Sequence, residues 1–206
     1  MEIYSTEEEQ VDAIKQFWKD YGTSIVVGAA VGLGGLFGWN YYSDHQIAQA
    51  ESASEAFQSI SDPGMTEAAM LSASETFSED HNQEGYQSLL SLMLAKSAVE
   101  VSDFEKAETI LKSVIASAPD TSLVMVATIR LARVQAEQGQ VATAITTLEQ
   151  VSDPAFTAQR DELKGDFLVR KGDTEQAKVA YQAAVDNGGV MTSPALQMKL
   201  DNLNKA

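Results

Sequence analysis

Few residues in this chain of 206 amino acids have the types and spacing that catalysis or metal binding requires. There is no cysteine, which excludes disulfides, thiolate metal sites and a cysteine nucleophile. The two histidines, His45 and His81, are isolated in the sequence, which leaves little material for a histidine metal site or a catalytic triad. Adjacent acidic pairs such as Asp161 and Glu162 point apart on a helix, and no H-E-x-x-H, G-x-S-x-G or Walker motif is present. We therefore predict a protein that is not an enzyme and that needs no metal or cofactor.

The charge balance narrows the possible partners further. The chain has 30 acidic and 14 basic side chains, which gives a formal net charge of −16. Nucleic-acid binding requires clustered lysine and arginine, so the composition argues against DNA or RNA as a partner. The composition instead favours helices and a role in binding other proteins.

A repeated pattern predicts the helices that would position such binding residues. Alanines at 107, 144 and 177 are separated by 37 and 33 residues. Each follows a small residue in the preceding predicted helix and precedes a large residue four positions later. The small residues allow two antiparallel helices to touch, and the large residue fills the space toward the next unit. The three sets are Ala95, Ala107 and Leu111; Ala132, Ala144 and Leu148; and Gly165, Ala177 and Tyr181.

This spacing resembles the tetratricopeptide repeat, strongly over residues 86–190 and weakly over 44–85. The resemblance implies an all-α fold in which antiparallel helix hairpins stack into an α-solenoid. An eroded earlier copy places Ala73 and Phe77 at the same offsets. The unequal spacing of the alanines predicts an irregular superhelix.

In stacked hairpins of this kind, the first helix of each pair lines the concave face. That face mixes apolar and charged residues, which suits an extended polypeptide or a partner helix. Many of these side chains could equally serve only to solvate the surface or to cover the next helix. The candidate groove residues are Leu92, Lys96, Val99, Ile129, Arg133, Ala136, Glu162, Asp166, Val169 and Arg170.

An apolar segment near the N-terminus predicts a membrane anchor. Residues 21–43 contain no Asp, Glu, Lys, Arg or His, and residues 25–39 are entirely apolar or glycine. About 20 residues of helix cross the roughly 30 Å of a bilayer core, and aromatic residues flank this segment at both ends. The segment is too long and its leader too acidic for a cleaved signal peptide, although 48–50 reads A-x-A. We predict an amphipathic segment at 1–21, a transmembrane helix at 22–43 and a repeat domain at 44–206.

The positions of the lysines predict the orientation of this anchor. Lys15 and Lys19 precede the apolar segment, and the next basic residue is Lys96. Basic residues near a span remain in the cytoplasm. The chain is therefore predicted to be a single-pass, type II protein of the bacterial inner membrane. Its N-terminus would be cytoplasmic, with residues 44–206 in the periplasm. The apolar stripe of residues 1–21 would lie on the membrane surface or continue the membrane helix.

Two glycine pairs lie within the predicted span, Gly28 with Gly32 and Gly34 with Gly38. Small residues at this spacing let two membrane helices approach closely, which would allow docking on another membrane protein. Glycine is also common in membrane helices for other reasons, so both interpretations remain open.

Strings along the whole chain carry a narrower resemblance. They are Met1-Glu2-Ile3-Tyr4, Glu-Gln-Val-Asp-Ala-Ile-Lys at 9–15, Gly38-Trp39, Leu-Ala-Arg-Val-Gln at 131–135 and Asn202-Leu203. Together they resemble the YfgM family, the ancillary single-pass subunits of the bacterial SecYEG translocon. The resemblance implies a repeat domain in the periplasm, association with SecYEG and with the membrane-bound chaperone PpiD, and help in passing translocating polypeptides to periplasmic chaperones. The alternative is a scaffold for another envelope process, such as wall synthesis or outer-membrane assembly.

Overall fold

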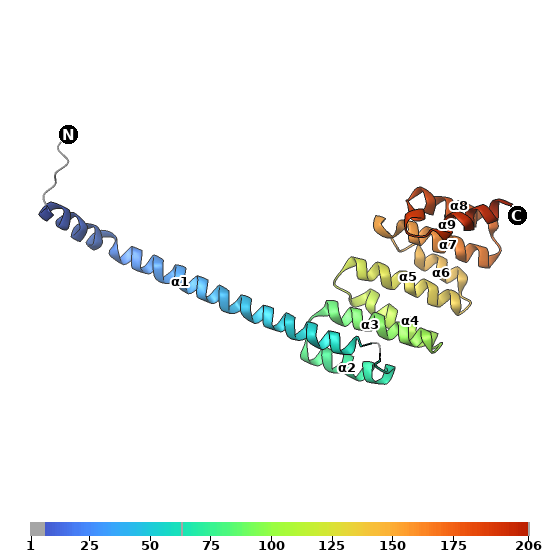
Figure 1. Cartoon of the computed structure of the whole chain (residues 1–206), viewed down its shortest axis with the longest axis horizontal. Coiled ribbons are helices and arrows are strands. Elements are labelled where there is room, and N and C mark those ends of the chain that lie inside the picture. Colours follow the sequence, from blue (N-terminus) through green and yellow to red (C-terminus); the bar gives the residue numbers. More distant parts are fainter. Residues whose placement is uncertain (1–6, 63, 206) are drawn as a thin grey trace. The chain divides into compact units, whose positions relative to one another are not determined.

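The computed structural model describes residues 7–62 and 64–205, and this described part is helical without any strand (Figure 1). The all-α prediction is confirmed. The string at 1–4 lies outside the described residues. The chain divides into two compact units, residues 1–52 and 53–206. The helices are α1 (Glu7–Ile60), α2 (Glu67–Asp80), α3 (Glu84–Glu100), α4 (Phe104–Ser117), α5 (Thr121–Glu137), α6 (Val141–Leu148), α7 (Thr157–Lys171), α8 (Thr174–Asp186) and α9 (Ala195–Lys205), with short 3-10 turns η1 (Pro154–Phe156) and η2 (Gly189–Met191).

The first unit consists of the greater part of α1, a helix of 54 residues. The helix passes through the predicted boundaries at 21 and 43 without a break, so residues 7–21 continue the apolar helix. Only 6% of its most apolar window is buried, and Phe37 is 73% exposed. A core helix of a soluble protein would be covered, whereas exposed apolar side chains of this size are stable in lipid. Among the described helices, α1 alone is long and apolar enough to cross a membrane.

The second unit is a stack of helix hairpins. Helix α3 packs on α4, α5 on α6, and α7 on α8, in chain order (Figure 1). The alanines at 107, 144 and 177 are completely buried. Ala132, the small residue paired with Ala144, is also completely buried, and Ala95, paired with Ala107, is 2% exposed. The small residues thus lie where the paired helices touch, and the predicted repeat is confirmed.

The third hairpin shows why a glycine replaces alanine at position 165. A Cβ atom added to Gly165 would overlap the ring of Tyr181, which is itself buried. The other two hairpins have Leu111 and Leu148 at the position of Tyr181. The larger aromatic ring therefore requires the loss of the facing methyl group, because a packed core has no spare volume.

The eroded N-terminal copy is also a hairpin. The last residues of α1, from Ala53 to Ile60, pack with α2 around Phe77, which is 2% exposed, and Ala73 is partly buried beside them. The same cluster includes Leu90 and Leu94 of α3. The final turns of the long helix therefore belong to the repeat domain and act as the first helix of its first hairpin.

Enlarging a buried alanine tests this packing. We expect Ala144→Leu to lower the free energy of unfolding by about 1–3 kcal/mol, because extra methyl groups at a helix contact force the helices apart. Urea unfolding of the full chain in detergent, followed by circular dichroism, measures this. Ala142→Leu is the matched control, since Ala142 is exposed on the same helix. Equal stability of the two variants would contradict the assigned contact.

A candidate protein-binding groove

The ten candidate groove residues fall into two sets. Leu92, Ile129 and Ala136 are 3–5% exposed and belong to the hydrophobic core between hairpins, so their side chains are not accessible to a partner. The other seven reach the surface: Lys96 and Val99 on α3, Arg133 on α5, and Glu162, Asp166, Val169 and Arg170 on α7. The groove thus has a smaller accessible surface than the pattern predicted.

Three of the accessible residues line one cavity, which we call the α3–α5 cavity. It has a volume of about 300 Å³. Its lining combines an apolar floor with charged residues and adds Phe104, Arg130 and Glu137 to the predicted set. The lining residues are Ala95, Lys96, Val99, Phe104, Leu111, Arg130, Arg133, Val134 and Glu137.

A second cavity lies beside it, and we call it the α7–α9 cavity. Its volume is about 580 Å³, and it is lined by Glu162 and Asp166 of α7, by Phe156 of η1 and by Lys199 of α9. Arg133 lines both cavities, so the two are adjacent along the first helices. The structure therefore brings five of the predicted residues to one continuous surface.

The cations of the α3–α5 cavity differ in how firmly they are held. Lys96 pairs with Glu100 at 3.4 Å, with both side chains exposed. Arg130 donates to the carbonyl oxygen of Leu92 at 3.3 Å. Arg133 is exposed and makes no hydrogen bond or ion pair within the part of the chain that the structure describes. A guanidinium group left in this way is available to a carboxylate from outside.

The acidic residues on α7 have partners from the C-terminus. Lys199 contacts Glu162 at 2.9 Å and Asp166 at 2.8 Å, and Tyr181 donates to Asp166 at 2.8 Å. Burial works to lower the pKa of Lys199, but the hydrogen bonds that its ammonium group donates to Asp166 and Glu162 outweigh this effect and raise that pKa. Burial, followed by the hydrogen bond to Asp166, raises the pKa of Tyr181. Glu162 and Asp166 therefore fix α9 in place, and the single positive charge of Lys199 compensates one of the two carboxylates.

The contacts of Lys199 with Glu162 and Asp166 were not predicted from the sequence. Lys199 lies beyond the repeats, so no periodic spacing connects it with α7. A salt bridge of 2.8 Å also joins Arg170 of α7 to Glu137 of α5. Val169 remains exposed next to it.

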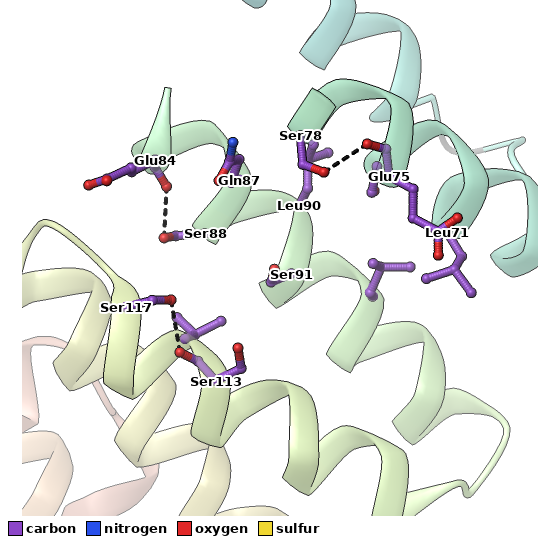
Figure 2. A pocket seen from close by; sticks show the side chains of 13 residues that line it. Leu71, Glu75, Ser78, Glu84, Gln87, Ser88, Leu90, Ser91, Ser113 and Ser117 are labelled. Atoms are coloured by element: carbon purple, nitrogen blue, oxygen red, sulfur yellow. Dashed lines mark hydrogen bonds between the residues drawn. The ribbon is translucent and has the colours of Figure 1, made fainter. Parts of the chain in front are cut away.

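A third cavity, of about 380 Å³, lies between α2, α3 and α4 and is lined by many serines (Figure 2). Figure 2 shows that Ser78, Ser88 and Ser117 donate to carbonyl oxygens of their own helices, those of Glu75, Glu84 and Ser113. The hydroxyl groups of these three serines therefore already donate hydrogen bonds within their own helices. Across the described residues, no cluster of His, Cys, Asp or Glu could hold a metal ion.

The glycines of α1 form a separate candidate surface. A Cβ atom placed on Gly28, Gly32, Gly34 or Gly38 would meet nothing within 4 Å. Each of these positions is exposed in the described helix, with room for another helix to approach its backbone.

Comparison with known proteins gives this arrangement a family. The model of the tetratricopeptide repeat-like domain matches residues 15–205. A protein of Escherichia coli K12 named "Ancillary SecYEG translocon subunit" is 36% identical, with 99% of this chain and 100% of the relative aligned. A protein of Haemophilus influenzae with the same name is 35% identical over 97% of this chain and 99% of the relative. A solved structure described as "MamA RS-1 ArsTM double mutant" shares the fold, with a TM-score of 0.53 and 18% identity over 76% of this chain and 95% of the other.

The chain has the architecture of a repeat protein with an apolar N-terminal helix. It belongs to the family of ancillary SecYEG translocon subunits, which confirms the resemblance. Because these relatives are named as translocon subunits and share the repeat-like domain, the chain is a non-enzymatic member of that family.

The contacts of Lys199 generate a pH-dependent prediction. A lysine whose pKa is raised on folding stabilises the fold fully below its unfolded pKa of about 10.4, and the stabilisation disappears as the pH rises through the folded pKa. We expect Lys199→Met to lower the free energy of unfolding by about 1 kcal/mol near pH 8. The difference from the unmodified chain should shrink above about pH 11. Urea unfolding at both pH values measures it, with Lys171→Met as the control on an exposed lysine. A difference independent of pH would contradict a role for the lysine charge.

Proposed function

We propose that the protein is a membrane-anchored subunit of the SecYEG translocon whose repeat domain works in the periplasm. Its groove binds proteins there, including translocating polypeptides, and helps to pass them to periplasmic chaperones such as the membrane-bound PpiD. The observation that carries the proposal is the full-length relationship to ancillary translocon subunits, which includes the apolar helix as well as the repeats.

The physical properties of the two units fit membrane anchoring by the first unit and protein binding by the second. Helix α1 exposes apolar side chains and glycines, which suits contact with lipid and with another membrane helix. The repeat domain exposes a groove that combines apolar and charged side chains. Lys15 and Lys19, together with the absence of Lys and Arg from 20–95, favour a cytoplasmic N-terminus and a periplasmic groove.

Protease treatment tests the orientation. Protease added outside spheroplasts should digest the repeat domain and leave a membrane-protected fragment that contains Lys15 and Lys19, because only the C-terminal part would be accessible. Immunoblotting with antibodies against each end detects both outcomes. A repeat domain that resists digestion until the membrane is dissolved would overturn the proposed orientation.

Crosslinking tests the partners. A photoactivatable residue at Val31 should give adducts with translocon subunits, and one at Val99 should give adducts with chaperones or translocating polypeptides, because both side chains are exposed. The control position is Val179, which is 71% exposed on α8, the second helix of its hairpin. Adducts with enzymes of wall synthesis or with outer-membrane assembly proteins would instead support the alternative scaffold.

The glycine surface has its own test. Gly28→Leu combined with Gly32→Leu should reduce co-isolation of the translocon about fivefold, since bulky side chains prevent close contact of helix backbones. Val31→Leu, which keeps the glycines and the apolar character, is the control. Unchanged co-isolation would show that these glycines have no part in docking.

A further inference from the structure

The α3–α5 cavity differs from the other cavities in its floor and in its charge. Ala95, Leu111 and Val134 form a buried apolar floor, and Val99 at the edge is 38% exposed. An apolar cavity of about 150 Å³ can hold benzene. The volume here, about 300 Å³, is therefore ample for one leucine or phenylalanine side chain.

Three cations surround this apolar floor. Lys96, Arg130 and Arg133 line the cavity, and the single acidic residue in its lining, Glu137, is paired with Arg170 at 2.8 Å. Lys96 is likewise paired, with Glu100 at 3.4 Å, so Arg130 and Arg133 leave the cavity with a positive charge. This is notable because residues 44–206 carry 12 basic and 24 acidic side chains, and 44–95 contains nine acidic residues but no Lys or Arg.

The neighbouring cavities lack this combination. In the α7–α9 cavity, the two carboxylates of Glu162 and Asp166 offset the charges of Lys199 and Arg133, so its lining has no surplus of positive charge. The serine-lined cavity has Glu75 and Glu84 in its lining and no cation. A bound polypeptide with acidic residues would be repelled by the acidic stretch 44–95 and attracted to the α3–α5 cavity, so charge complementarity selects this cavity over the other two.

We infer that the α3–α5 cavity is a specificity pocket for an apolar side chain that lies between acidic residues of a bound polypeptide. The apolar side chain contacts Val99, Phe104 and the buried floor. The carboxylates on either side pair with Arg133 and Lys96, and Arg133 needs no rearrangement because it has no competing partner in the described residues. This inference rests on the proposed function and adds to it the chemical class of the polypeptide that the groove prefers.

Binding of short labelled peptides to the full chain in detergent micelles tests the inference. One fluorescein-labelled peptide has a central leucine between aspartates, a second replaces the aspartates by lysines, and a third replaces the leucine by serine. Fluorescence anisotropy should show that the first binds at least about tenfold more tightly than either of the others. Binding should also weaken with added salt, because the charges are exposed. Equal affinity for the aspartate and lysine peptides would overturn the inference.

Variants locate the site. Lys96→Glu combined with Arg133→Glu should weaken binding of the acidic peptide by about tenfold or more. Lys112→Glu combined with Lys171→Glu makes the same change in net charge outside all the described cavities and should leave binding nearly unchanged. Val99→Ser, a small change at an exposed position, should weaken the leucine peptide without affecting the serine peptide. Equal loss in the two charge-reversal variants would overturn the assignment.

The outcome can be separated from that of the proposed function. Crosslinks from Val31 to the translocon report anchoring and do not depend on the pocket. If these crosslinks persist while peptides of both charges bind alike, only the pocket assignment fails. Crosslinks from Val99 to a second copy of this chain, in place of the peptide, would also overturn it by showing a different occupant.

Discussion

Close contact between paired helices is the constraint on which the repeat domain depends. Ala107, Ala144 and Ala177 are completely buried, and each lets the second helix of a hairpin approach the first. A single hairpin has too little apolar surface to cover itself, so neighbouring hairpins must stack. Stacking then places the first helices α3 and α5 side by side, with Val99 and Arg133 exposed between them. The candidate groove is therefore a consequence of how tightly the alanines pack.

The last hairpin shows how a change in the core reaches the surface. Tyr181 takes the place of a leucine, and Gly165 makes room for its ring. The hydroxyl group of the tyrosine extends to Asp166, which also contacts Lys199. A larger side chain in the core thus provides a hydrogen bond near the groove and contributes to fixing α9, which ends the stack. Lys199 offsets only one of the two carboxylates of the α7–α9 cavity, so the surplus positive charge of the groove lies with α3 and α5.

The sequence was sufficient for the features that depend on spacing and composition. The buried alanines, the helical hairpins and the apolar helix followed from periodicity and from the absence of charge in 21–43. The accessibility of individual groove residues could not be predicted from the sequence. Leu92 and Lys96 lie one turn apart on the same helix, and the packing of the next hairpin decides which of them is covered. The partners of Glu162 and Asp166 were also missed. Lys199 comes from α9, outside the repeat, and Tyr181 comes from α8, and contacts between distant segments leave no local pattern.

The distribution of cations connects the topology of the chain with the properties of its groove. In the orientation proposed above, the segment after the membrane helix enters the periplasm; such segments avoid lysine and arginine, and here none occurs from 20 to 95. The basic residues of the second unit therefore begin at Lys96, where α3 contributes to the groove. Nine of the 24 acidic residues of 44–206 lie in 44–95, so the cations at Lys96, Arg130 and Arg133 follow directly on the most negative part of the domain. Electrostatic attraction in such a field acts first on the encounter and orientation of a charged partner and less on its final affinity. An apolar floor is then needed to retain the segment that the charges have oriented, and the α3–α5 cavity combines both.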